Sequence, residues 1–192
     1  MFSPSVKLKH ALMISNNLHL KQKERSMKQP EINIDDDVQI DEDTLKDKYL
    51  TFYIGKESYG IEIRHVKEII VMQEITEVPD MPKSIIGVIN LRGNVISVID
   101  FRKFFNLDTR EYDDRTSIIV VEINNTSVGL VVDTVNEVVD IPEKNTDPPP
   151  RTHSGVGSKY INGIGKIGND VRILLNIENI LYENELEAVA AD

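Results

Sequence analysis

The chain lacks cysteine altogether, so none of its 192 residues can form a disulfide or a thiolate metal site. This absence fits a reducing compartment. No apolar run approaches the roughly 20 residues that a membrane-spanning helix needs. The first residues also lack the continuous hydrophobic segment of a signal peptide. We therefore expect a cytoplasmic protein with no direct membrane insertion.

Basic residues are in short supply. The sequence has 22 lysines and arginines against 32 aspartates and glutamates, which gives a formal net charge of −10. Nucleic acids and anionic lipid surfaces bind clustered lysine and arginine, and they repel an acidic chain. The composition therefore predicts neither nucleic acid nor an anionic membrane surface as the partner.

Regular periodicity is missing from the first part of the chain. Basic residues lie before position 29, and an acidic run follows between Asp35 and Asp43. Neither stretch sustains the spacing of a helix or a strand, so residues 1–48 are predicted to be a disordered tail. The basic stretch leaves contact with nucleic acid or lipid open, but a solvated tail is the favoured interpretation. Residues 183–192 are interpreted as a C-terminal tail.

From Tyr49 onward the sequence is rich in valine and isoleucine and breaks into short runs. The run Tyr49–Ile54 is followed by GKES and YGIEI, and the run Arg115–Ile123 is followed by NNTS and VGLVV. Branched apolar runs joined by a short turn with Gly or Asn are typical of β-hairpins. We predict the same hairpin in both places.

The similarity between the two halves continues beyond these hairpins. Gly, Val and Glu recur at equal spacing in residues 60–69 and 129–138, and residues 87–95 correspond to 163–171. Each half then ends in a strand and a short apolar helix, VISVID with FRKFF and VRILLN with IENIL. The chain is therefore predicted to contain two β-rich units. A unit of about 60 residues is only marginally stable alone, which favours a fixed interface between the two.

Short strands without crossover helices favour small closed barrels over a parallel α/β sheet. We predict a mainly β protein with short helices, with the first barrel at about 49–107 and the second at about 108–182. The second half carries an extra loop, whose prolines at 148–150 hold it extended and outside any sheet.

No constellation of residues supports catalysis or cofactor binding. Residues 163–168 match G-x-G-x-x-G, but a turn and another strand follow where a dinucleotide site needs a helix, so the glycines are assigned to a hairpin. The four histidines are not at metal-ligand spacing, and no nucleophile elbow frames a serine. The prediction is a non-enzymatic protein without metal, cofactor or catalytic residues.

Several segments resemble the CheW family of bacterial chemotaxis coupling proteins. They are YLTFYIGKESYGIEIRHVKEII, VPDMPKSIIGVINLRGNVISVIDFRKFF, VGLVVDTVNEVVDIP and YINGIGKIGNDVRILLNIENIL. Together they span about residues 49–182, in the family's order and with its spacing. The stretch centred on Asn90-Leu91-Arg92-Gly93 is the most recognisable of them.

The resemblance implies two SH3-like five-stranded barrels around a shared hydrophobic core. It further implies an adaptor that couples methyl-accepting chemoreceptors to the histidine kinase CheA in signalling arrays. One surface would bind the regulatory domain of CheA, and a groove between the barrels would take the receptor's cytoplasmic tip.

Five residues match partner-binding positions of the family: Val66, Glu68, Gly87, Arg92 and Val135. Val66 and Glu68 are expected on a short helix, with Val66 as either core or an exposed anchor. Gly87 permits either the close approach of a partner or a strand bend. Arg92 bonds a partner or ties two hairpins together, and Val135 is expected on the receptor side.

Two alternatives to the adaptor stay open from the sequence. One is a barrel that binds a small ligand, or acts on one, in the groove between the units, which requires convergent polar groups and a perturbed ionisable residue. The other is a CheW-like regulatory module whose partner lies outside chemotaxis.

Overall fold

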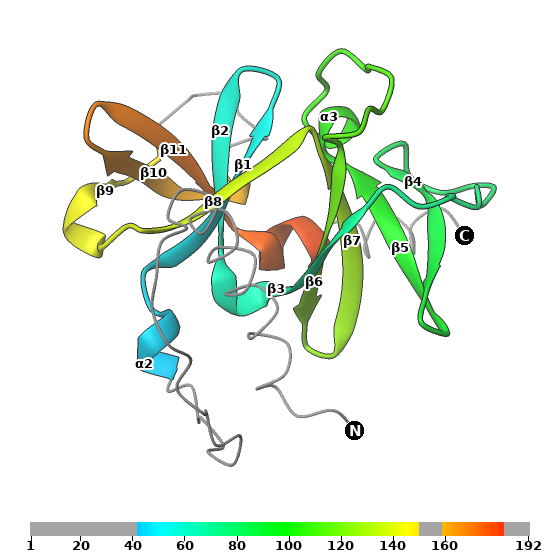
Figure 1. Cartoon of the computed structure of the whole chain (residues 1–192), viewed down its shortest axis with the longest axis horizontal. Coiled ribbons are helices and arrows are strands. Elements are labelled where there is room, and N and C mark those ends of the chain that lie inside the picture. The colour runs from blue at the N-terminus through cyan, green and yellow to red at the C-terminus, as the bar shows by residue number, and fades with distance from the viewer. Residues whose placement is uncertain (1–41, 150–158, 183–192) are drawn as a thin grey trace, which may run out of the picture. The chain divides into compact units, whose positions relative to one another are not determined.

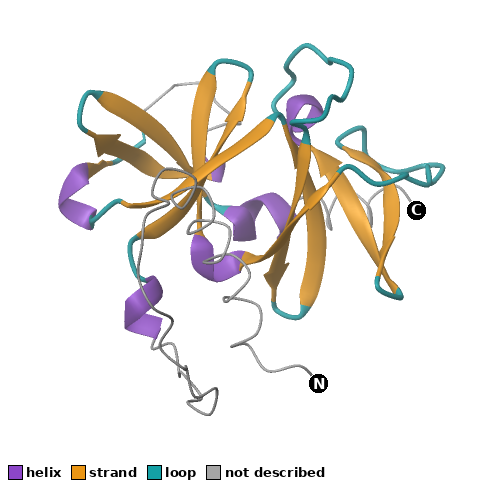
Figure 2. Ribbon diagram, viewed as in Figure 1, coloured by secondary structure: helices purple, strands orange, loops and turns teal. Residues whose placement is uncertain are grey.

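The structure, a computed structural model, describes residues 42–149 and 159–182 (Figure 1). The chain divides into two units, Met1–Lys46 and Asp47–Asp192, and each is considered by itself. The described part of the first unit is the helix α2 (Glu42–Leu45). The other described elements belong to the second unit and are mostly strands (Figure 2).

Three stretches lie outside the described residues, namely 1–41, 150–158 and 183–192. The predicted C-terminal tail falls there, together with most of the predicted N-terminal tail and part of the proline-containing loop.

Both predicted hairpins are confirmed. The first consists of β1 (Lys48–Ile54) and β2 (Glu57–Glu62), and the second of β6 (Ser117–Ile123) and β7 (Thr126–Val132). A two-residue hairpin turn favours positive φ, which Gly and Asn adopt at low cost. The sequence supplies Gly55 at φ 64° in the first turn and an Asn pair at φ 49° and 67° in the second.

The remaining elements follow these hairpins in each half. The strands are β3 (Val66–Val71), β4 (Ile85–Leu91), β5 (Asn94–Asp100), β8 (Thr134–Asp140), β9 (Thr146–Asp147), β10 (Ile161–Ile167) and β11 (Asp170–Leu175). The short helices are η2 (Ile63–His65), α3 (Phe101–Phe104), η3 (Glu143–Asn145) and a helix at 177–182. The predicted helices after VISVID and VRILLN are therefore present.

The prediction of a helix around Val66 and Glu68 is wrong. Only residues 63–65 form a single 3₁₀ turn, and both residues lie on strand β3. Pairing with β6 overrides the local pattern there, because the run VKEIIV also suits a strand that is half buried.

The strands form two sheets with matching internal order. Sheet A runs β8-β1-β2-β11-β10-β9, and sheet B runs β3-β6-β7-β5-β4. Each contains a single strand, then one hairpin, then a second hairpin joined to the first by a parallel pair, β2 with β11 or β7 with β5. The two halves of the sequence thus repeat one arrangement, and this arrangement fits the predicted SH3-like fold.

The two sheets do not follow the boundary predicted near residue 107. Hairpin β1–β2 comes from the first half but joins β8–β11, whereas β6–β7 comes from the second half and joins β3–β5 (Figure 1). Each repeat has thus exchanged its first hairpin with the other. Sequence periodicity identifies strands and local hairpins, but it does not determine which distant strand pairs with a hairpin's outer edge.

Close approach of the segment after β3 to strand β4 brings the edges of sheet B together. The N–H groups of Thr76 and Val88 each donate to the other's carbonyl at 2.9 Å. Gly87 makes this approach possible: its φ is 142°, and an added Cβ would lie 2.3 Å from the Thr76 carbonyl oxygen. In sheet A the same position is taken by β9, which continues β8 through η3 and adds a sixth strand to the predicted five.

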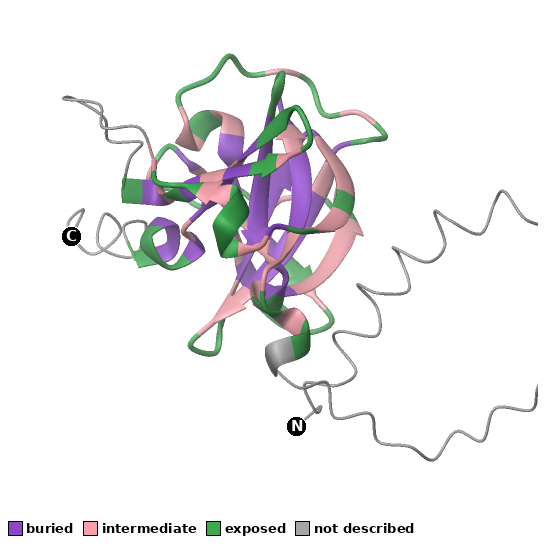
Figure 3. Ribbon diagram, turned by 90° about the vertical axis from the view of Figure 1, so that its left-hand side faces the viewer, coloured by how far each residue is buried: buried purple, intermediate pink, exposed green. Residues whose placement is uncertain are grey.

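Buried residues, purple in Figure 3, lie mainly on the strands inside the second unit. One cluster lies within sheet B and consists of Ile89, Ile96, Val98, Ile118, Val120 and Val131. Residues of both edge strands, Ile70 of β3 and Ile86 of β4, pack against it, which requires the sheet to curl around this cluster.

Aromatic rings connect the two sheets through α3, the helix that follows β5. Phe101 of α3 lies 6.0 Å from Phe52 of β1, and Phe105 stacks on Tyr59 of β2 at 5.4 Å between ring centroids. Each such pair contributes about 0.5–1.5 kcal/mol beyond its area burial. This is the shared hydrophobic centre that the family resemblance implied.

A buried carboxylate lies where the chain crosses from sheet B to sheet A. Asp133, between β7 and β8, accepts two hydrogen bonds from Arg102 at 2.8 and 2.6 Å and one from the Gly55 N–H at 2.6 Å. Burial alone would raise the pKa of Asp133, but the bonds from Arg102 and Gly55 outweigh it and leave this pKa below its usual range. One carboxylate thus joins the β1–β2 turn, α3 and the crossover.

We predict that Gly87→Ala lowers the free energy of unfolding by about 2–4 kcal/mol, because the new methyl group meets the Thr76 backbone and φ is unfavourable for alanine. Gly93→Ala is the matched control, since its φ of 88° is also positive but no atom lies within 4 Å of the added Cβ. Its cost should be nearer about 1 kcal/mol. Denaturant unfolding of both variants measures the difference, and equal costs would contradict this role for Gly87.

We further predict that Asp133→Asn costs about 2–3 kcal/mol at neutral pH, because it leaves the Arg102 charge unpaired. The lowered pKa means that the Asp133 contribution is present above about pH 4 and is lost as the pH falls through the folded-state value. Wild type and variant should therefore converge in stability below about pH 4. Asp140→Asn, which removes an exposed pair with Lys48, should change little. A constant difference down to pH 2 would contradict the prediction.

Candidate partner-binding site

Two of the five predicted site residues, Glu68 and Arg92, form one ion pair. Arg92 lies in the turn between β4 and β5, and its two terminal nitrogens donate to the two carboxylate oxygens of Glu68 at 3.1 and 2.7 Å. The turn needs positive φ at both central residues, 53° at Arg92 and 88° at Gly93. The Asn90 side-chain oxygen supports it by accepting the Gly93 N–H at 2.8 Å.

The two members of this pair differ in exposure. The Glu68 side chain is 10% exposed, whereas that of Arg92 is 73% exposed. Glu68 therefore acts as an anchor for Arg92. A guanidinium has five N–H donors, so the two bonds to Glu68 leave three donors for a partner.

The structure places the other three predicted residues elsewhere. Val66 on β3 is 4% exposed and thus belongs to the core, the first of its two interpretations. Gly87 permits a bend and a close approach, but the approaching backbone is the protein's own Thr76. Val135 is half-buried on β8 of sheet A, away from the other four on sheet B. Partner contacts by these residues stay predictions.

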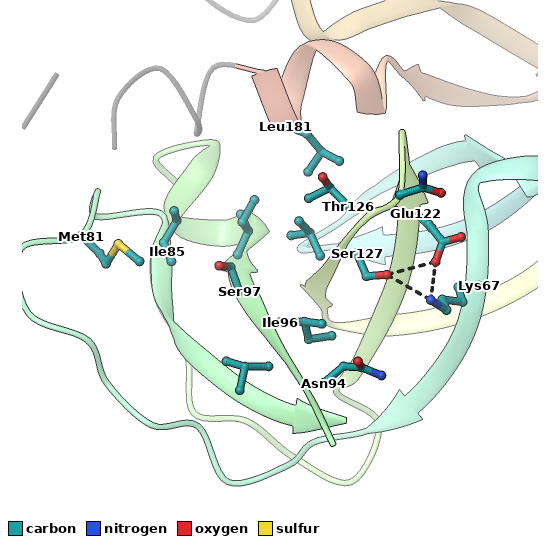
Figure 4. Close-up of a pocket in the computed structure, with 14 residues that line it drawn as sticks. Lys67, Met81, Ile85, Asn94, Ile96, Ser97, Glu122, Thr126, Ser127 and Leu181 are labelled. Carbon is teal, nitrogen blue, oxygen red and sulfur yellow. Dashed lines mark hydrogen bonds and ion pairs between the residues drawn. The ribbon is translucent and has the colours of Figure 1, made fainter. Parts of the chain in front are cut away.

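A pocket is lined by residues that adjoin this ion pair in the sequence, with Lys67 next to Glu68 and Asn94 after the turn of Arg92. It is a cavity of about 580 Å³, formed by strands of sheet B, the loop before β4 and the helix at 177–182 (Figure 4). Its apolar lining includes Met81, Ile85, Ile99, Val128 and Leu181. The helix follows β11 of sheet A, so the pocket combines strands of sheet B with an element connected to sheet A.

Polar side chains gather at one side of the pocket (Figure 4). Lys67 of β3 pairs with Glu122 of β6 and lies 3.1 Å from the Ser127 hydroxyl, which lies 3.2 Å from the same Glu122 oxygen. Lys67 and Glu122 are the pocket's ionisable residues, and they neutralise each other. Because these side chains come from three strands, only the pairing of the strands brings them together.

The remaining motifs contribute no site in the described part of the chain. Residues 163–168 lie in β10 and its turn to β11, as the hairpin interpretation predicted. Among residues 42–149 and 159–182, no three His, Asp or Glu side chains are grouped to hold a metal. None of the helices described there is both long and apolar enough to cross a membrane.

Comparison with known proteins agrees with this geometry. The model of the CheW-like domain matches residues 48–185. The chemotaxis protein CheW of Klebsiella aerogenes is 34% identical over 147 residues, covering 77% of this chain and 89% of the relative. That of Bacillus subtilis (strain 168) is 37% identical over 131 residues, covering 68% and 82%.

A solved structure shows the same similarity. The scaffolding protein TtCheW from Thermoanaerobacter tengcongensis superimposes with a TM-score of 0.63 at 36% identity, covering 68% of this chain and 84% of that one. The fold thus defines a protein built from two SH3-like units, like this scaffolding protein. The chain belongs to the CheW family of chemotaxis proteins. The resemblance found in the sequence is confirmed, and the comparisons favour the chemotaxis scaffold over both alternatives.

Proposed function

We propose that this protein joins two partners, the cytoplasmic tip of methyl-accepting chemoreceptors and the regulatory domain of a CheA-type histidine kinase. Its place would be the cytoplasmic side of membrane receptor arrays, where it would act without making or breaking bonds. Membership of the CheW family supports this role. The observation that carries it is the exposed Arg92, which donates two hydrogen bonds to the largely buried carboxylate of Glu68.

The Arg92 surface is proposed to bind the kinase regulatory domain. A guanidinium held in advance loses less rotamer freedom on binding than a mobile one, so more of its interaction energy appears as affinity. Its free donors suit backbone carbonyls or a carboxylate of the partner. Glu68 would act by orienting Arg92, since little of its own side chain is exposed.

The pocket is proposed to take apolar side chains from the receptor tip. Its aliphatic walls suit the apolar face of a helical hairpin, and its two ionisable residues already pair with each other. A charged group entering the pocket would lose its hydration without gaining a counter-ion. The occupant should therefore be uncharged.

We predict that Arg92→Ala weakens binding of the kinase regulatory domain at least tenfold, because charge-assisted hydrogen bonds in an interface are lost. The variant should keep a cooperative thermal transition, since the removed side chain is 73% exposed. Arg115→Ala is the matched control, an arginine 66% exposed in an ion pair with Asp113. Isothermal titration tests both variants. Unchanged affinity would contradict a binding role of Arg92, and loss of the cooperative transition would make Arg92 a structural residue.

We also predict that Met81→Glu weakens binding of a receptor tip fragment about tenfold or more, because it places an unpaired carboxylate against the aliphatic wall. Val78→Glu is the control on the same loop, since Val78 is 37% exposed and does not line the pocket. Titration with the fragment distinguishes the two variants. Equal effects would exclude the pocket as the receptor site.

A further inference from the structure

Strand β3 contains an irregularity at Lys67. Val66 pairs with Val121 of β6 and Glu68 pairs with Val120, so two consecutive residues of β6 face three of β3. Lys67 is the extra residue and has no partner in the ladder. Such a bulge re-aims the side chains around it and depends on other contacts to stay in one conformation.

The bulge directs neighbouring side chains into different sites. Lys67 lines the pocket, where Glu122 and Ser127 hold its ammonium group (Figure 4). Glu68, the next residue, holds Arg92, which does not line the pocket. The conformation of three consecutive residues therefore determines both the polar side of the pocket and the orientation of Arg92.

A second connection runs through the β4–β5 turn. Arg92 and Gly93 form this turn, and the following residues 94–97 line the pocket. In both chain segments that supply the Glu68–Arg92 ion pair, neighbouring residues therefore line the pocket.

We propose that Lys67 is a positioning residue that couples the pocket to the Arg92 surface through the β3 bulge. This inference rests on the proposed function. An apolar occupant excludes water from around Lys67 and Glu122, and a lower local dielectric strengthens their attraction. The bulge is then held more firmly, the Glu68–Arg92 pair is formed for a larger fraction of the time, and the kinase domain binds a surface that is more completely ordered than in the free protein.

The test is a titration of the kinase regulatory domain into the full chain, with and without a saturating receptor tip fragment. For the wild type we expect about fivefold tighter binding with the fragment present, and by linkage the reciprocal effect must be equal. Lys67→Met should reduce the ratio to about one. Lys67→Arg, which keeps the ion pair, should restore it.

Lys48→Met is the matched control. Lys48 also forms an ion pair, with Asp140, and its side chain is 29% exposed against 28% for Lys67, but it lies on sheet A outside the pocket. This variant should keep the fivefold ratio. A merely structural role of Lys67 would change each affinity or the melting temperature and leave the ratio unchanged.

Two results would overturn the inference while leaving the proposed function intact. One is a wild-type ratio of one although both partners bind, and the other is a ratio that Lys67→Met does not alter. Failure of either partner to bind the wild type would instead overturn the proposed function, and the coupling with it.

Discussion

Two parallel strand pairs, β2 with β11 and β7 with β5, hold the hairpin of each repeat inside the sheet of the other. A barrel of about 60 residues buries so little surface that it is only marginally stable alone, and here neither repeat can complete its sheet without its partner. The aromatic contacts of α3 and the Asp133 crossover lie where these exchanged segments meet. Folding should therefore be cooperative across the whole second unit, because no cut in the sequence separates one sheet from the other.

That constraint also positions the site. Glu68 lies on the edge strand β3 and Arg92 in the turn that follows the opposite edge strand β4, and they meet because the sheet curls until Thr76 pairs with Val88. Gly87 permits this closure, since any side chain there would overlap the Thr76 backbone. A residue far from the exposed guanidinium thus determines where that guanidinium lies. The family position at Gly87 has a physical explanation within the fold, without any contact to a partner.

Opposite charges serve different purposes in the two ion pairs of strand β3. The Glu68–Arg92 pair leaves the arginine exposed, where it can contact a partner. In the Lys67–Glu122 pair both side chains are about one-third exposed or less, and the two charges neutralise each other at the pocket. The first arrangement suits a polar partner and the second an apolar one. For the two partners proposed above, this contrast would give selectivity, because each surface would disfavour the other's ligand.

The sequence by itself determined the hairpins, the repeat and the family, since these depend on local periodicity, turn residues and motifs in order. It left Val66 between core and surface and assigned residues 63–70 to a helix, because VKEIIV fits more than one environment until a neighbouring strand is specified. Only the tertiary structure decided which hairpin enters which sheet, joined Glu68 to Arg92 and assembled the pocket around Lys67. These features join residues far apart in the chain, and periodicity carries no information about which distant edges pair.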